Sequence, residues 1–553
     1  MPTIVTLLLY YWLITFSIVG YGILFHKFFV KNNDIEIGYI GIYGIFFLSI
    51  ISYLTYFIIP HGQIFNAVIV ISGFIYFYFN RNIIYIKKDV KYLLIIFFIL
   101  ILFILSAKNH DDFSYYHFSY IHLITEFSNI IGLGNFNHGF RTPSSIFYFS
   151  SLFNLPYSNY FLLNISPVFF LGFSNLIFIN KIKNYLNFNK ADPVLYLSLM
   201  SLIFVNIFFY RLAEHGTDRS AMILILILII EILQLNNFKK KLNESYYLNL
   251  ILVITLVISL KAFYVLYILL FIPLSLLFFK NKLSLIYFIK NKTLYMCLLM
   301  IVFIVISNFF NSGCLIYPVQ FLCFESFSWS IPLSEVEMMN NWYQQWSKAG
   351  AGPNYRVENP EIYIQNFNWL SNWIERYFFN KVSDFLLGIL FLLLVMTLTF
   401  YSKNKKKNIQ YKFHFLYFIL LILTFEWFYF HPTLRYGGYH LIALLLFIPV
   451  SIFMSKFLIN QSKLKLKVYF LLGLTLVIFS TRNIIRINKE YNLYDYNILK
   501  NAFYRDEEKN FTIFNKINNL NECFIDSQNK ECNNQDITLK KIGNYKIYYR
   551  KNK

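Results

Sequence analysis

Long apolar stretches recur along most of the chain, and they constrain its fold more than any other feature. A bilayer crossing needs about 17 to 25 apolar residues. Stretches suited to it lie at 4–26, 37–59, 64–80, 91–107, 157–179, 193–210, 221–235, 294–310, 385–401, 413–430, 441–458 and 467–481. Only 14% of the residues are charged, against about a quarter in globular proteins. The sequence therefore predicts an all-α polytopic membrane protein.

The stretch 248–279 is long for one crossing and predicts two. Lys261 stands in its middle, and lysines flank it at 239–241 and again at 280 and 282. Because basic residues concentrate on the cytoplasmic side, both flanks should lie there. The stretch should then form two short helices that turn near Lys261, which brings the total to about fourteen transmembrane helices.

Basic residues also sort the loops. Those of the short loops fall on one side of the membrane, at 27–31, 81–91, 181–190, 239–241, 280–292, 403–412 and 456–467. The N-terminus, the long loops and the tail from about 482 fall on the other side. By the positive-inside rule, both termini are expected to be extracytoplasmic in a multi-pass protein of the cytoplasmic membrane. The net charge of +21 then reflects topology and contact with the lipid bilayer, and no nucleic acid is expected as a partner.

Two domains are expected. Residues 1–482 form a transmembrane domain with outward loops at 108–156 and 311–384. Residues 483–553 form a small extracytoplasmic C-terminal domain, and the alternating pattern at its end indicates a strand and thus a possible α/β cap. Two equally spaced cysteine pairs on the outward side predict two local disulfides: Cys314 with Cys323, and Cys523 with Cys532.

The outward loop that begins near Lys108 carries the densest group of chemically active side chains. Asp111 and Asp112 are adjacent, His110 precedes them, and His122 and Glu126 follow. Polar residues at 115, 119, 122 and 126 recur at helical spacing and predict an amphipathic helix in the membrane interface. Further along the loop, Thr142 and Pro143 predict the start of a short helix over 143–153.

Three other outward turns place ionisable groups near the same membrane surface. They are AEHGTDRS with His215, Asp218 and Arg219, the turn at Lys261, and HPTLRYGGYH with His431, Arg435 and His440. Ionisable side chains at membrane helix ends mark functional sites by default. We expect the following to bind substrate: Lys261, Arg435, Arg219, Asp218, His215, Glu126 and Arg141.

This set of residues suits chemistry on a phosphate held at the membrane surface. The carboxylate pair Asp111 and Asp112 is suited to act as a general base or to hold a divalent cation such as Mg²⁺ or Mn²⁺. His110 and His122 would orient the reacting groups. Arginine and lysine neutralise phosphate. A donor with its lipid in the bilayer and its phosphate at the outer surface would meet both sets.

An acidic motif in the first large outward loop, followed by many further spans, resembles the C-type superfamily of integral-membrane glycosyltransferases. The resemblance implies a polyprenyl-phosphate-linked sugar donor and a catalytic role for Asp111 or Asp112. It departs from many members in that the acidic loop follows the fourth span. The motifs HDDFSYYH, GLGNFNHGFRTPSS, HGTDRS, SLKAFYVLY, SGCLIYP and RYGGYH also resemble an uncharacterised group of bacterial polytopic membrane proteins.

The expected function is transfer of a sugar from a polyprenyl-phosphate donor to a lipid, glycan or protein acceptor on the outer face. One alternative is an O-antigen-type polysaccharide polymerase, in which Arg356 and Arg376 would matter more than the carboxylates. Another is a transporter or flippase of lipid-linked glycan. Transporters tend to have internal repeats and ionisable groups at the midplane, and the charges here lie at the outer ends.

Overall fold

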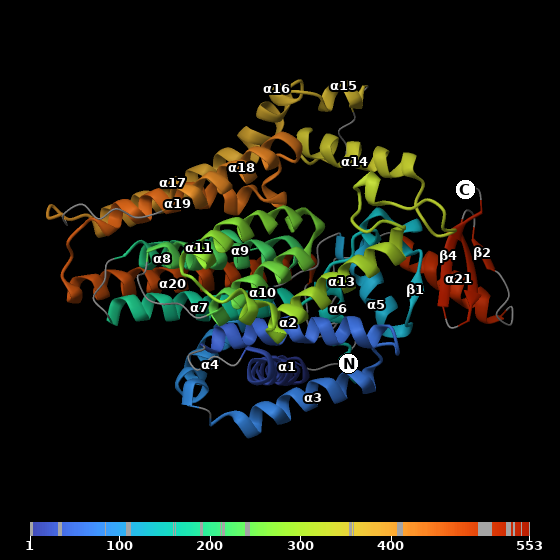
Figure 1. Cartoon of the computed structure of the whole chain (residues 1–553), viewed down its shortest axis with the longest axis horizontal. Helices are drawn as coiled ribbons and strands as arrows, with labels where there is room; N and C mark the ends of the chain where they lie inside the picture. The colour runs from blue at the N-terminus through green and yellow to red at the C-terminus, as the bar shows by residue number, and fades with distance from the viewer. Residues whose placement is uncertain are drawn as a thin grey trace.

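The computed structural model is a bundle of helices with a small sheet at one end (Figure 1). It describes residues 4–30, 36–82, 84–106, 112–158, 160, 162–187, 192–210, 212, 216–237, 244–352, 357, 359–405, 413–495, 511–526, 532–534, 537–543 and 545–551.

Four helices form the N-terminal part of the bundle: α1 (Ile4–Phe25, extended by a π-helical turn His26–Val30), α2 (Ile37–Tyr56), α3 (Gln63–Asn80) and α4 (Ile84–Leu105). Glycines let them approach closely, as small residues do in membrane helix packing. A Cβ atom on Gly20 of α1 would lie 1.9 Å from the Gly73 carbonyl oxygen of α3. One on Gly44 of α2 would lie 1.9 Å from the Ile18 carbonyl oxygen of α1.

The remaining long helices pack beside this group: α7 (Ser166–Asn187), α8 (Pro193–Phe208), α9 (Gly216–Asn237), α10 (Glu244–Leu260), α11 (Phe271–Lys280), α13 (Lys292–Ser312), α17 (Ser383–Phe400), α18 (His414–Phe430), α19 (Gly438–Ser455) and α20 (Gln461–Tyr494). Short α12 (Leu285–Ile289) precedes α13. The break in the stretch 248–279 falls at Lys261, between α10 and the 3-10 helix η5 (Ala262–Leu270) that leads into α11.

Each of the predicted apolar stretches overlaps a helix, but the count of about fourteen crossings is not confirmed. In the part of the chain that the structure describes, eight helical segments are long and apolar enough to cross a membrane: 4–30, 37–56, 63–80, 262–280, 292–312, 370–400, 438–455 and 461–493. Three shorter apolar helices, α8, α10 and α18, accompany them. The chain is thus a multi-pass helical membrane protein.

Connections between the helices gather at two ends of the bundle. Figure 1 shows the large loops and the sheet at one end, and the α17–α18 and α19–α20 connections at the other. At the large-loop end, the His61 amide donates to the Ile124 carbonyl oxygen over 3.0 Å. At the other end, Lys405 forms a β-bridge with Phe457. This division matches the sorting of loops by their basic residues.

The segment expected to be an amphipathic interfacial helix is instead buried. It consists of a π-helical turn η2 (Phe113–His117) and α5 (Phe118–Glu126). All of α5 except His122 and Glu126 is buried, because α6 (Ser145–Ser151) and α21 (Thr512–Asp526) pack against this segment. The helix predicted over 143–153 is α6, and Ser144 caps it by accepting from the Ile146 amide.

The C-terminal residues complete a sheet with the first large loop. Strands β2 (Cys532–Asn534), β3 (Ile537–Ile542) and β4 (Tyr545–Arg550) are antiparallel, and β4 pairs in parallel with β1 (Ile130–Ile131) in the order β1-β4-β3-β2. Two 3-10 turns, η3 (Leu133–Asn135) and η4 (His138–Phe140), follow β1. Helix α20 runs without a break through the predicted domain boundary at 482, so this C-terminal module begins beyond α20. The pairing of β1 with β4 joins the module to the 112–156 loop.

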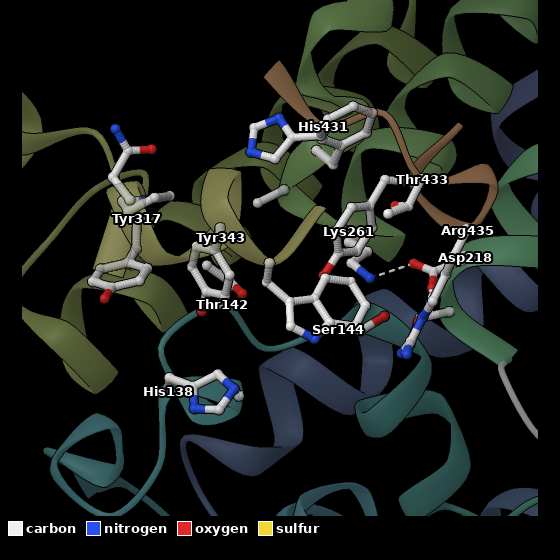
Figure 2. Close-up of a pocket in the computed structure, with 18 of the residues that line it drawn as sticks. His138, Thr142, Ser144, Asp218, Lys261, Tyr317, Tyr343, His431, Thr433 and Arg435 are labelled. Carbon is white, nitrogen blue, oxygen red and sulfur yellow. Dashed lines mark hydrogen bonds and ion pairs between the residues drawn. The ribbon is translucent and has the colours of Figure 1, made fainter. Parts of the chain in front are cut away.

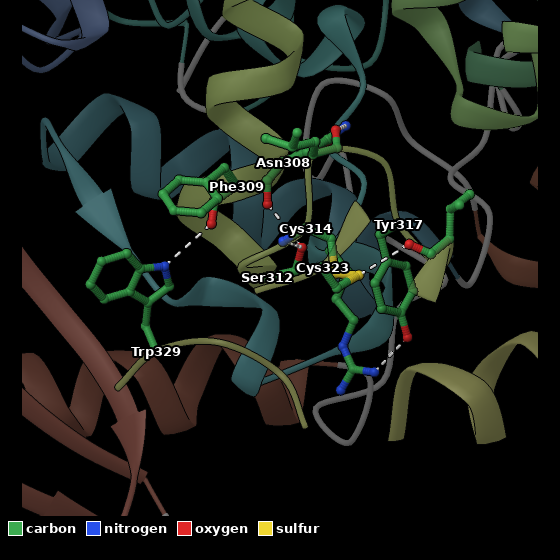
Figure 3. The surroundings of a disulfide bond; sticks show 10 residues. Asn308, Phe309, Ser312, Cys314, Tyr317, Cys323 and Trp329 are labelled. Atoms are coloured by element: carbon green, nitrogen blue, oxygen red, sulfur yellow. Dashed lines mark hydrogen bonds between the residues drawn. A yellow bond between two sulfur atoms is a disulfide. The ribbon is translucent and has the colours of Figure 1, made fainter. Parts of the chain in front are cut away.

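The second large loop carries η6 (Gln320–Leu322), α14 (Leu333–Lys348), α15 (Pro360–Ile364), α16 (Leu370–Trp373) and the π-helix η7 (Ile374–Val382). A disulfide joins Cys314 to Cys323 near the start of this loop (Figure 3). A second disulfide joins Cys523 of α21 to Cys532 of β2. Both bonds pair the cysteines that the sequence spacing pairs.

Candidate functional site

Four charged side chains from four different segments form one network at the large-loop end. Arg435 donates from Nη2 to Asp112 Oδ2 over 2.7 Å and from Nε to Asp218 Oδ2 over 2.8 Å. The second oxygen of Asp218, Oδ1, forms an ion pair with Lys261 Nζ (Figure 2). We call Asp112, Asp218, Lys261 and Arg435 the ionic cluster. Two carboxylates and two cations thus neutralise each other.

Each member of the cluster stands where regular helix begins or breaks. Asp112 directly precedes η2, and Asp218 lies in the first turn of α9, where a helix N-terminus favours negative charge. Lys261 occupies the non-helical position between α10 and η5. Arg435 belongs to a 3-10 turn, η8 (Leu434–Tyr436), between α18 and α19. The helix junctions therefore bring residues far apart in sequence to the same depth.

The two carboxylates differ in their exposure to solvent. The Asp218 side chain is 1% exposed, whereas those of Asp112, Lys261 and Arg435 are 25%, 26% and 26% exposed. Burial alone would raise the pKa of Asp218, but Lys261 and Arg435 lower it below its usual value. Asp218 is therefore a buried anchor for both cations, and Asp112 is the carboxylate that a substrate can reach.

The ionic cluster lines a cavity of about 1150 Å³. Its wall comes from the 112–147 loop, the N-terminus of α9, η5, the 316–322 loop, α14 and the 431–439 turn. Arg219 also lines it, buried, with its guanidinium carbon 5.6 Å from the centres of the Phe209 and Tyr439 rings. The structure thus brings Asp112, Asp218, Arg219, Lys261 and Arg435 to one cavity.

One side of the cavity borders an apolar surface. Leu266 of η5 lines the cavity and is 37% exposed. Exposed apolar side chains continue from it along η5 and α11, at Ile268, Ile272, Leu276 and Phe279. In a helix that is apolar enough to cross a membrane, such a stripe faces lipid.

Other predicted substrate-binding residues lie elsewhere. Arg141 is buried and outside the cavity wall, where its Nη1 donates to the Tyr317 hydroxyl over 2.8 Å and its Nη2 pairs with Glu335. Arg550 of β4 pairs with the same Glu335 over 2.6 Å. Arg141 therefore joins the 132–141 segment to α14 and the C-terminal module. Glu126 is exposed at the end of α5, also away from the cavity.

His122, predicted to orient the reacting groups, packs between the loop and the C-terminal module. Its ring centre is 5.7 Å from that of Phe118 and 5.1 Å from that of Phe514, and it does not line the cavity. Burial lowers its pKa to about 4. His110, Asp111 and His215 lie outside the described residues, as does Arg356, whereas Arg376 is exposed and donates to Asn372.

Sequence reasoning missed part of the cavity wall. Trp342, Tyr343 and Trp346 of α14 and Tyr436 of η8 line it. For Trp342 and Trp346 the signal in the sequence is the concentration of tryptophan in the 311–384 loop, which surface helices explain equally well. Tyr343 and Tyr436 have no distinguishing signal in a chain with 45 tyrosines.

A divalent cation at the carboxylate pair stays a prediction. The described residues contain no group of three or more His, Cys, Asp or Glu side chains suited to hold a metal. Arg435 already contacts the Asp112 carboxylate, which leaves that oxygen poorly placed for a second cation. We therefore derive no step through a metal ion.

The fold and the site together define a multi-pass helical membrane protein with a charged cavity at one end. The chain belongs to the family described as a domain of unknown function, DUF8201, whose model matches residues 4–442. The match includes every member of the ionic cluster and ends before α20 and the C-terminal module. No curated protein and no solved structure matches the chain significantly.

Proposed function

We propose that the protein is a cell-envelope glycosyltransferase that moves a sugar from a polyprenyl-phosphate donor to an acceptor on the outer face of the cytoplasmic membrane. The observation that carries the proposal is the ionic cluster, which places a reachable carboxylate beside two cations in a cavity bordering a lipid-facing surface. This arrangement also fits the resemblance to the C-type superfamily. The C-terminal module would then be extracytoplasmic.

The cations would bind the donor phosphate. Lys261, Arg435 and Arg219 all line the cavity, and arginine binds phosphate oxygens through two parallel hydrogen bonds. Asp218, which is almost fully buried, would hold Lys261 and Arg435 in place and would not touch the substrate. The apolar stripe that starts at Leu266 would accommodate the polyprenyl chain, so that the phosphate stays at the membrane surface.

Donor binding would also prepare the base. A phosphate that binds Arg435 competes with Asp112 for the same guanidinium, and Asp112 would then accept a proton from the acceptor hydroxyl. The acceptor oxygen then bonds to the anomeric carbon while the bond from that carbon to the phosphate oxygen breaks. Polyprenyl phosphate leaves, the proton stays on Asp112, and the anomeric configuration inverts. Asp111 is the alternative base.

The experiment replaces the chromosomal copy of the gene by variants and compares envelope glycans by mass spectrometry. Asp112→Asn, alone and with Asp111→Asn, and Arg435→Lys should remove the glycan product while protein amounts in the membrane stay unchanged. The matched controls are Asp384→Asn and Arg376→Lys, because both side chains are exposed and outside the cavity wall. An unchanged glycan profile in the Asp111→Asn/Asp112→Asn double variant refutes the proposal.

The same variants separate the alternatives. A polymerase that depends on outward arginines would lose activity in Arg376→Lys and Arg356→Lys and keep it in Asp112→Asn. A flippase would move labelled lipid-linked sugar across proteoliposomes without forming a glycosidic bond.

A further inference from the structure

Helix α14 presents an aromatic face to the cavity beside the ionic cluster. Trp342, Trp346 and Ala349 all line the cavity. They are four and three residues apart, so they share one face of the helix. The Trp346 and Tyr436 ring centres are 5.7 Å apart, and Trp342 and His138 lie 5.5 Å apart. The α14 residues thus form a wall that continues onto the opposite segments.

Tyr436 connects this wall to the ionic cluster. Lys261 Nζ lies 4.9 Å from the centre of the Tyr436 ring, and Trp346 approaches the same ring. A molecule lying on Trp346 would therefore sit one ring away from Lys261. An acceptor bound there would lie next to the ionic cluster, where its hydroxyl could reach Asp112 and the donor.

Polar groups accompany the aromatic rings. Asn340 and Gln345 of α14 also line the cavity. His431 Nδ1 is buried and has no hydrogen-bond partner among the described residues. Burial lowers the pKa of His431 to about 4, so its ring is neutral at physiological pH and offers both a donor and an acceptor. Figure 2 shows His138, Tyr343 and His431 around the cavity, away from Arg435.

Helix α14 is polar on its outer side. The side of α14 away from the cavity carries Ser334, Glu337 and Asn341, and the one large apolar side chain exposed on this helix is Met338. The η5 side, in contrast, continues into the apolar stripe of Leu266 and Ile268. The cavity thus has one border suited to a lipid and another suited to a water-soluble chain.

From this geometry we infer that the face formed by Trp342, Trp346, Tyr436 and His431 is a subsite for a neutral pyranose glycan. Flat aromatic rings offer their faces to the C–H side of a pyranose, and a few amide and imidazole groups fix its hydroxyls. Its role as the acceptor subsite rests on the proposed function. Binding of the glycan does not.

The test measures binding without catalysis. The full-length protein and its Asp112→Asn variant are embedded in nanodiscs, with no glycoside detergent because its sugar head would compete. Saturation-transfer difference NMR is recorded with cellotetraose, maltotetraose and chitotetraose. We expect saturation of pyranose protons of at least one of these in both proteins, and an affinity about tenfold lower in Trp342→Leu/Trp346→Leu.

The matched control is Trp12→Leu, because Trp12 lies on α1 and not in the cavity wall. His431→Phe keeps a ring but removes the imidazole nitrogens, and it should weaken binding while leaving the tryptophan fluorescence spectrum unchanged. No saturation transfer from any of the three glycans, or equal transfer in the tryptophan double variant, overturns the inference. Glycan binding by a protein that forms no glycosidic bond would instead refute the proposed function alone.

Discussion

Replacing each carboxylate of the ionic cluster by its amide should distinguish the structural role of Asp218 from the catalytic role of Asp112. In Asp218→Asn, Lys261 loses its carboxylate partner while Arg435 keeps Asp112. Breaking a buried pair costs about 3 to 5 kcal/mol. Because Lys261 is 26% exposed, solvent reduces the expected loss to about 2 to 3 kcal/mol. In Asp112→Asn, both partners are about a quarter exposed, and the expected loss is about 0 to 1 kcal/mol.

The assay is reversible unfolding by SDS in mixed micelles, followed by tryptophan fluorescence, beside the glycan profile of cells that carry each variant. Asp112→Asn should lose the product and keep its stability. Asp218→Asn should lose both, and Lys261→Met in the Asp218→Asn background should restore part of the stability, because an apolar side chain replaces an unpaired charge. Equal destabilisation by the two amides would contradict the division between a buried anchor and a reachable base.

Three further outcomes are expected. The folded-state pKa of His122, about 4 against an ordinary 6.5, means that the unfolded state takes up its proton first. His122 therefore contributes stability above pH 6.5 that is lost as the pH falls toward 4. The SDS unfolding of His122→Phe should accordingly depend less on pH in this window than that of the unsubstituted protein. A loss of transfer in fully folded His122→Phe would instead support the predicted catalytic role of His122. Removing the Cys314–Cys323 disulfide with Cys314→Ala/Cys323→Ala should lower the free energy of unfolding by about 2 to 3 kcal/mol. It should also reduce transfer, because residues 316–319, 321 and 322 line the cavity. The control is Cys523→Ala/Cys532→Ala, which removes a disulfide with the same separation of 9 residues and should reduce transfer less. EDTA should leave transfer by isolated membranes unchanged, because Arg435 and Lys261 supply the positive charge; loss of transfer that Mg²⁺ or Mn²⁺ reverses would establish the predicted cation.

Local patterns in the sequence predict much of the bundle. Apolar length locates the helices, and the lysine at 261 locates the break between α10 and η5. The positive-inside pattern groups the loops that the structure gathers at each end. Charges at helix ends also select Asp112, Asp218, Lys261 and Arg435 as candidates, since each is expensive to bury in apolar surroundings.

Pairing over long sequence distances is what the sequence does not show. The partner of β1 is β4, more than 400 residues later, and a strand of two residues has no pattern of its own. Helices α6 and α21 bury the helix expected at the interface. Likewise, Arg141 is a residue type that binds phosphate, but its guanidinium already forms an ion pair with Glu335 and a hydrogen bond to Tyr317.

Helix α9 bears on the choice between catalysis and transport because it carries a charged group near each end. Asp218 belongs to the ionic cluster, and Glu231 pairs with Lys181 over 2.6 Å near the other end. At 1.5 Å per residue, these carboxylates are about 20 Å apart along the helix. Between them, every residue from Ala221 to Ile230 is apolar and at most 1% exposed. A path for a polar glycan along this helix would need polar or solvent-lined positions within that stretch. The surface of α9 between Asp218 and Glu231 thus offers no polar path for a glycan, which favours the proposed transfer over transport.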